Sequence, residues 1–234
     1  MQMQSPEITF EAAPDAVSVL VVDDHPALRA GLERLLDQEA GFELLDAVSD
    51  EEELTSALDR RRPDVVILDY ALGQGDGLSA CFRVKQRPQP PGVILYSAYV
   101  DRVFAVPATV AQADAIVSKS APVEVLLSAI KAVAAGESEV PSPGPEAMDA
   151  ASSRLQADDL PVLGMLFAGI EVGEIATTMG LQPREVRSRA LRIIAAMQAH
   201  DRGNDHAPVQ TRARADVSVA PGPLAAVEVG GKRR

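Results

Sequence analysis

Five polar residues stand at the ends of short apolar runs in this 234-residue chain: Asp23, Asp24, Asp69, Ser97 and Lys119. Carboxylates packed together repel one another and favour protonation unless a cation lies among them. A set of oxygen ligands without His or Cys suits Mg²⁺, which binds few carboxylates and keeps several waters. Lys119 would add a positive charge and Ser97 a hydroxyl donor, so these side chains together describe a pocket for a dianion. A carboxylate in such a pocket can attack a phosphoryl group and form an acyl phosphate.

Each of these residues taken alone also has an ordinary interpretation. An Asp-Asp pair at the end of a strand is usually a polar turn, and a single Lys is usually solvated. The argument therefore depends on the combination: an acid pair, a third acid, a hydroxyl and a lysine, each after a different strand.

Alternating strands and helices must position these side chains. The β-branched apolar runs predict five strands, at 17–22, 42–48, 65–68, 92–97 and 115–118. Helices are expected at 26–41, 50–62, 101–111 and 122–135, with a further helix after the Gly-rich loop at 73–77 that turns Leu78 and Phe82 inward. Pro107 should shorten or distort the helix at 101–111. This alternation predicts the α/β class: a five-stranded parallel, doubly wound (flavodoxin-like) sheet. Ligands of such sheets lie at the carboxyl ends of strands, so the five side chains are expected to meet at one edge.

Composition divides the chain into five parts. We expect a disordered leader at 1–16, the α/β domain at 17–136, a Pro- and Gly-containing linker at 137–154, a short all-α domain at 155–200 and a disordered tail at 201–234.

Charge and cysteine content exclude several classes of protein. The net charge of −12 argues against a chain that is basic throughout, and the single Cys81 excludes an internal disulfide framework or a CxxC site. The sequence has no transmembrane run and no secretory signal at its start, so we expect a cytoplasmic location.

The second domain contains a helix-turn-helix pattern. Apolar spacing predicts helices within 158–169, 174–180 and 184–197, with Gly180 and Pro183 bounding the last turn. The last helix would be the recognition helix, and its candidate DNA contacts are Arg184, Arg187, Ser188, Arg189 and Arg192. An ordinary solvated helix face would show the same arginines.

The first domain resembles the receiver domain of bacterial two-component response regulators. The motifs that carry this resemblance are Val19-Leu-Val-Val-Asp-Asp-His-Pro26, Pro63-Asp-Val-Val-Ile-Leu-Asp69, Gly75-Asp-Gly77, Leu95-Tyr-Ser-Ala98 and Ser118-Lys119. The resemblance implies that Asp69 accepts a phosphoryl group from a sensor histidine kinase. It also implies that Asp23, Asp24, Asp69 and the Ala71 carbonyl hold Mg²⁺, and that Ser97 and Lys119 bind the phosphoryl group. Three positions depart from the family pattern: Gly73 replaces a usual Pro, Ile116 replaces a usual aromatic residue, and Pro107 stands in the fourth helix.

The second domain resembles the LuxR-like helix-turn-helix of the NarL/FixJ subfamily, without a gap over about 155–199. Gln182 stands in place of the usual Ser cap, and Glu185 lies among the arginines. The resemblance implies a non-enzymatic transcription regulator that forms a homodimer when phosphorylated.

Two alternatives stay open. The helical domain of a signalling adaptor would bind a protein partner instead of DNA. A phosphatase using Asp69 would need a general acid two residues away, and the sequence has no Asp-x-Asp pattern there.

Overall fold

The computed structural model describes residues 16–73, 76–98 and 104–204, with side chains described as far as residue 198. The strands are β1 (Val17–Val22), β2 (Phe42–Val48), β3 (Val65–Asp69), β4 (Gly92–Ser97) and β5 (Ala115–Ser118). The helices of the first domain are α1 (Pro26–Gln38), α2 (Glu51–Arg60), α3 (Gly77–Lys85), α4 (Ala105–Val110) and α5 (Val123–Ala134). They are followed by α6 (Pro145–Ser152), α7 (Leu160–Phe167), α8 (Val172–Met179) and α9 (Pro183–Asn204).

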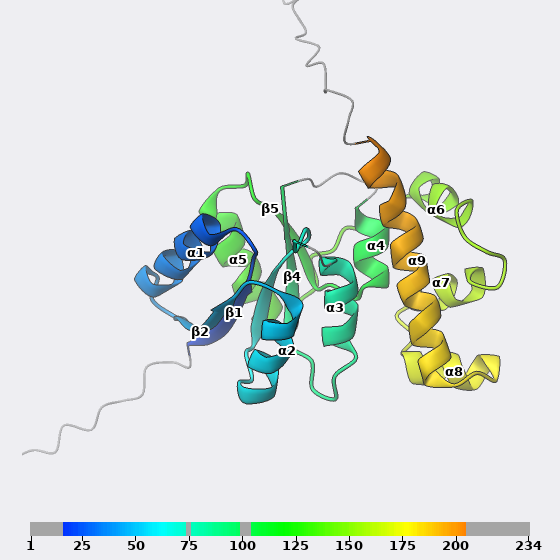
Figure 1. The fold of residues 1–234 in the computed structure, drawn as a ribbon, viewed down its shortest axis with the longest axis horizontal. Helices are drawn as coiled ribbons and strands as arrows, with labels where there is room; N and C mark the ends of the chain where they lie inside the picture. The colour runs from blue at the N-terminus through cyan, green and yellow to red at the C-terminus, as the bar shows by residue number, and fades with distance from the viewer. Residues whose placement is uncertain (1–15, 74–75, 99–103, 205–234) are drawn as a thin grey trace, which may run out of the picture.

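The five strands form one parallel sheet in the order β2-β1-β3-β4-β5, which confirms the predicted α/β fold. Residues of β1 alternate between the two faces of this sheet. Val19 and Val21 pack with the α1 and α5 side, whereas Leu20 and Val22 pack with α2 and α3. Figure 1 shows α1 and α5 on one face of the sheet and α2, α3 and α4 on the other.

Helix α4 is buried on all sides because it lies between the two domains. It contacts α3 on the side of the sheet and α6, α7 and α9 on the other side (Figure 1). Five of its six residues are buried, including Pro107, and the sixth is Thr109. A helix that is apolar all round is expected in such a position. The buried side chains of both domains consequently form one continuous apolar cluster.

The helical domain has the predicted helix-turn-helix. Helix α8 ends at Gly180, whose φ of +67° lies in the left-handed region that favours glycine. The backbone N–H of Leu181 donates to the carbonyl of Ala176 at 2.9 Å and closes the turn. Pro183 then begins α9.

Several predicted boundaries need correction. The linker expected at 137–154 contains α6, which begins at Pro145 and packs Ala147 and Met148 against the apolar cluster. Helix α9 continues to Asn204, beyond the boundary predicted at residue 200. Helix α4 begins at Ala105 where a helix was expected from 101, and residues 101–103 lie outside the described part. Most of the predicted leader (1–16) and tail (201–234), namely residues 1–15 and 205–234, also lies outside it.

Candidate functional site

The carboxyl edge of the sheet holds the residues predicted to act together. Asp69 is the last residue of β3 and Ser97 the last residue of β4, while Lys119 follows β5 directly. Asp23 follows β1 and is buried with 1% of its surface exposed; Asp69 is 3% exposed. Parallel strands end at the same edge, so residues far apart in sequence meet here.

Lys119 joins two of the acids. Its Nζ lies 2.8 Å from Oδ2 of Asp23 and 2.8 Å from Oδ2 of Asp69. Its backbone N–H donates to the carbonyl of Ser97 at 2.7 Å, which fixes the loop after β5 against the end of β4. The predicted grouping of Asp23, Asp69 and Lys119 therefore corresponds to direct contacts.

Burial and charge shift the pKa values of two of these groups in the same direction. Burial raises the pKa of the Asp69 carboxyl above its usual range, although Lys119 and the Ala71 N–H act against this. Burial lowers the pKa of Lys119, but its hydrogen bonds to Asp23 and Asp69 outweigh that effect and raise the pKa above the ordinary lysine value. The pocket consequently keeps its lysine charged and disfavours the ionised form of Asp69.

The donor set fits a divalent cation. Ligand atoms of Asp23, Asp24, His25 and Asp69 all lie within 4.8 Å of one another. Within the described part of the chain, Asp24 Oδ1 and Asp69 Oδ2 are buried carboxylate oxygens whose nearest polar neighbours are His25 Nδ1 at 2.7 Å and Lys119 Nζ at 2.8 Å. Buried carboxylate oxygens in this situation are suited to coordination by a hard cation such as Mg²⁺.

His25, for which the sequence predicts no role in the site, belongs to this cluster. Its Nδ1 lies 2.7 Å from Asp24 Oδ1 and 3.3 Å from Asp23 Oδ1, while two thirds of its side chain stays exposed. The only sequence signal was its position directly after the acid pair.

The segment after Asp69 is held by backbone hydrogen bonds. The N–H of Ala71 donates to Asp69 Oδ1 at 3.1 Å, and the N–H of Gly73 donates to Asp24 Oδ2 at 2.8 Å. A proline at position 73, as is usual in receiver domains, has no N–H and could not hold Asp24 in this way. The departure at Gly73 thus adds a contact inside the pocket. The role expected for the Ala71 carbonyl stays a prediction.

The predicted DNA contacts on α9 fall into two groups. Arg184, Arg187 and Ser188 are exposed. Arg189 instead donates to the carbonyl of Asp158 at 2.5 Å, and Arg192 lies 2.8 Å from Oδ1 of Asp159 in an ion pair. The second pair therefore holds α9 to the start of α7, although the Arg192 side chain is still 53% exposed, and the first group is exposed at the start of α9.

Glu185 has a structural role that the resemblance to LuxR-like domains does not indicate. Its Oε2 accepts a hydrogen bond from the backbone N–H of Gln182 at 2.7 Å, directly before α9. Glutamate at this position of a first helical turn is the acidic partner of a capping box. It satisfies an N–H where the usual Ser is absent.

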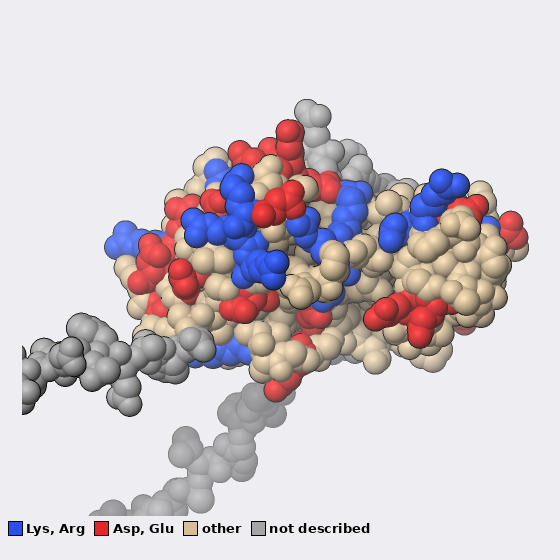
Figure 2. Space-filling model, turned by 90° about the horizontal axis from the view of Figure 1, so that it is seen from below, with Lys and Arg blue, Asp and Glu red and all other residues tan. Residues whose placement is uncertain are grey.

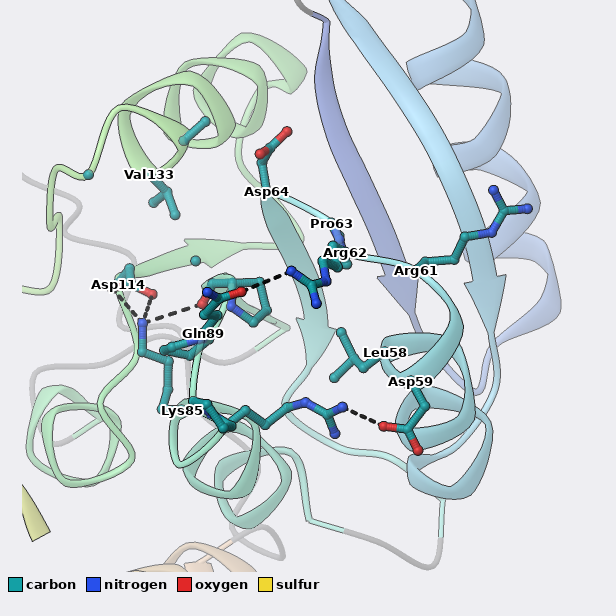
Figure 3. Close-up of a pocket in the computed structure, with 17 residues that line it drawn as sticks. Leu58, Asp59, Arg61, Arg62, Pro63, Asp64, Lys85, Gln89, Asp114 and Val133 are labelled. Atoms are coloured by element: carbon teal, nitrogen blue, oxygen red, sulfur yellow. Dashed lines mark hydrogen bonds and ion pairs between the residues drawn. The ribbon is translucent and has the colours of Figure 1, made fainter. Parts of the chain in front are cut away.

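A separate cavity of about 910 Å³ lies at the opposite, amino-terminal edge of the sheet. It is lined by Arg61, Arg62, Lys85 and Arg87 together with four prolines (Figure 3). Figure 2 views the molecule from this side and shows Lys and Arg side chains gathered on the receiver surface. Lys85 and Arg87 are paired with Asp114 and Asp59. The cavity contains none of the predicted site residues.

Comparison with known proteins supports the same two-domain interpretation. Residues 19–131 match the response regulator receiver domain family. A putative transcriptional regulator of Pseudomonas aeruginosa is 30% identical over 190 residues, covering 78% of this chain and 91% of that protein. The DNA-binding transcriptional activator DevR/DosR of Mycobacterium tuberculosis is 27% identical, covering 77% of this chain and 88% of that protein. A solved structure of a LuxR-family two-component response regulator from Aurantimonas is 26% identical with a TM-score of 0.51, covering 60% of this chain and 99% of that one.

No helix of the described residues has the length and apolar character needed to cross a membrane.

Proposed function

Because the chain belongs to the NarL/FixJ-type response regulators, we propose that it is a transcription regulator switched by phosphorylation of Asp69. The observation that carries this proposal is the contact of one lysine, Lys119, with both Asp23 and Asp69 at the carboxyl edge of the sheet. The donor would be a phosphohistidine of a sensor histidine kinase.

The transfer can be written for this chain's own atoms. A carboxylate oxygen of Asp69 attacks phosphorus, a P–O bond forms, the P–N bond of the phosphohistidine breaks, and the released imidazole takes up a proton. Lys119 holds a positive charge beside the incoming phosphoryl oxygens, and Ser97 offers its hydroxyl to one of them. Burial of Asp69 excludes water from the carboxylate that reacts.

A bound Mg²⁺ would be held by Asp23, Asp24, Asp69 and the carbonyl of Ala71, and it would neutralise negative charge on the phosphoryl oxygens. His25 contributes to the geometry by its contact with Asp24.

The helical domain is proposed to bind DNA through the exposed start of α9. Arg184 and Arg187 would contact phosphates or guanine edges, with Ser188 beside them. Paired helical domains in a phosphorylated homodimer would gain affinity through effective concentration. The relatives are transcription regulators, which favours this role over that of a signalling adaptor.

Two measurements test the proposal. The protein is incubated with Mg²⁺ and acetyl phosphate, and its intact mass should rise by one phosphoryl group, with no rise for Asp69→Asn. DNA selection with the phosphorylated protein should then enrich a defined site, and Arg187→Ala should weaken binding to it. An equal mass gain in both proteins would contradict the role of Asp69, and recovery of no enriched site would contradict the role of α9.

A further inference from the structure

The helical domain is docked on the receiver through α9. This helix contacts α3 and α4 as well as α7 and α8. The docking surface is apolar for the most part, and the buried residues of α9 belong to the same cluster as those of α4. Such an interface is stabilised mainly by the removal of apolar surface from water. A polar group inside it is therefore informative, because it must find a partner there.

Gln198 is that polar group. It lies near the end of the described part of α9, and only 8% of its surface is exposed. Its Nε2 donates a hydrogen bond to Oδ1 of Asp76, a residue of the receiver 122 positions earlier in the chain. The same carboxylate caps α3, since Oδ1 accepts from the N–H of Leu78 at 3.0 Å and Oδ2 from the hydroxyl of Ser79 at 2.5 Å. The capping residue of α3 is thus also the contact point for α9.

Asp76 is connected to the backbone at Asp69, the proposed phosphoacceptor, through the contacts of its neighbour Gly77. The N–H of the next residue, Gly77, donates to the carbonyl of Tyr70 at 3.0 Å, and Tyr70 directly follows Asp69. A Cβ on Gly77 would lie 2.1 Å from the backbone oxygen of Asp69. The start of α3 is therefore packed against the backbone of the residue that reacts.

A second contact runs from the same segment to α4. The Tyr70 ring lies edge-on to the Phe104 ring, with centroids 4.7 Å apart and an interplanar angle of 69°. Phe104 immediately precedes α4, and α4 contacts α9. Tyr70 therefore contacts the residue before α4, on which the helical domain rests, and Asp76 contacts α9 of that domain directly. Neither contact passes through Ile116, the position where receivers usually carry an aromatic residue.

We infer that Gln198 is a positioning residue that couples the docking of α9 to the position of the start of α3, which packs against the backbone of Asp69 and Tyr70. The inference rests on the proposed role of Asp69 as phosphoacceptor. A phosphoryl group on Asp69 displaces the start of α3, the Asp76–Gln198 hydrogen bond is lost, and α9 leaves the receiver. Arg184 and Arg187 are exposed in the docked state. Docking therefore does not act by covering these arginines. In the proposal it acts by holding the helical domain on the receiver, so that the domain cannot pair with that of a second copy.

The test compares three variants of the full chain by hydrogen–deuterium exchange of peptides that cover α4 and α9. Gln198→Glu places a carboxylate against Asp76 and should raise exchange in both helices by about tenfold, as expected when a hydrogen bond to a charged group is lost. Gln156→Glu makes the same charge change at an exposed position of the helical domain and should leave exchange unchanged. Asp76→Asn combined with Gln198→Glu removes the repulsion between two carboxylates while the amide oxygen introduced at position 76 still accepts from the N–H of Leu78, and it should return exchange part of the way towards the wild-type rate.

Rescue by the double variant distinguishes this role from general loss of packing. Asparagine is as good a helix cap as aspartate, so Asp76→Asn is expected to keep α3 intact. The inference is overturned if Gln198→Glu exchanges like Gln156→Glu, or if the double variant exchanges as fast as Gln198→Glu.

A final arm connects the contact to phosphorylation. Acetyl phosphate with Mg²⁺ should raise exchange in α4 and α9 of the wild type, and should add little in Gln198→Glu, whose contact is already lost. Intact mass is measured on the same samples. Absence of a mass gain would contradict the proposed function, whereas a mass gain without a change in exchange would contradict the coupling alone.

Discussion

Gly77→Ala is expected to destabilise the receiver and to displace Asp69, the proposed phosphoacceptor. The added Cβ would lie 2.1 Å from the backbone oxygen of Asp69 and 2.8 Å from both the Cα and the carbonyl oxygen of Tyr70. All three neighbours are backbone atoms, so the conflict cannot be relieved by rotation of a side chain. Overpacking of a well-packed site costs 1–3 kcal/mol and sometimes more, and with three such contacts we expect a loss of about 2–4 kcal/mol in the free energy of unfolding.

Urea denaturation of the wild type and the variant measures this loss. Gly31→Ala is the matched control, because Gly31 lies inside α1 and a Cβ there would meet nothing within 4 Å. That control should gain about 0.5–1 kcal/mol, the usual advantage of Ala over Gly in a helix. Phosphoryl uptake from acetyl phosphate should be slower in Gly77→Ala than in Gly31→Ala. Unchanged stability together with unchanged uptake would refute the idea that close packing at Gly77 positions Asp69.

Three further changes test other parts of the structure. Burial raises the pKa of the Asp69 carboxyl in the folded protein, so protonated Asp69 stabilises the fold. This stabilisation is fully present below pH 3.8 and is lost as the pH rises through the pKa of the folded state. Asp69→Asn, which is never ionised, should therefore melt at a higher temperature than the wild type at pH 7, and the difference should vanish in acid. Arg187→Ala should lower DNA affinity at unchanged melting temperature, whereas Arg192→Ala, which removes an ion pair to α7, should also lower the melting temperature. Gly180→Ala should cost about 1 kcal/mol in urea denaturation because the left-handed backbone there disfavours a Cβ.

The sequence was sufficient to predict the sheet and most of the acidic pocket. Each strand is a short apolar run that ends in a polar residue, and the parallel topology brings those ends together without further information. Asp23, Asp69 and Lys119 could be assigned to one site for this reason, since their positions follow from the strand ends alone.

Contacts between distant surfaces could not be predicted in this way. The docking of α9 on α4 depends on complementary shape between two apolar surfaces, and the sequence pattern of each helix shows only that it has such a surface. The hydrogen bond that Glu185 accepts from the N–H of Gln182 was likewise not predicted, because it depends on the local geometry at the start of α9. Helix α6 was missed because its few apolar side chains are stabilised by the neighbouring cluster and not by their own spacing.

The measurement that tests the central claim most directly is chemical identification of the phosphorylated residue. The protein is treated with Mg²⁺ and acetyl phosphate, the acyl phosphate is reduced with borohydride, and the digested peptides are sequenced by mass spectrometry. The account predicts that the residue converted to homoserine is Asp69. Conversion of a different aspartate, or of none in a protein that remains folded, would contradict it.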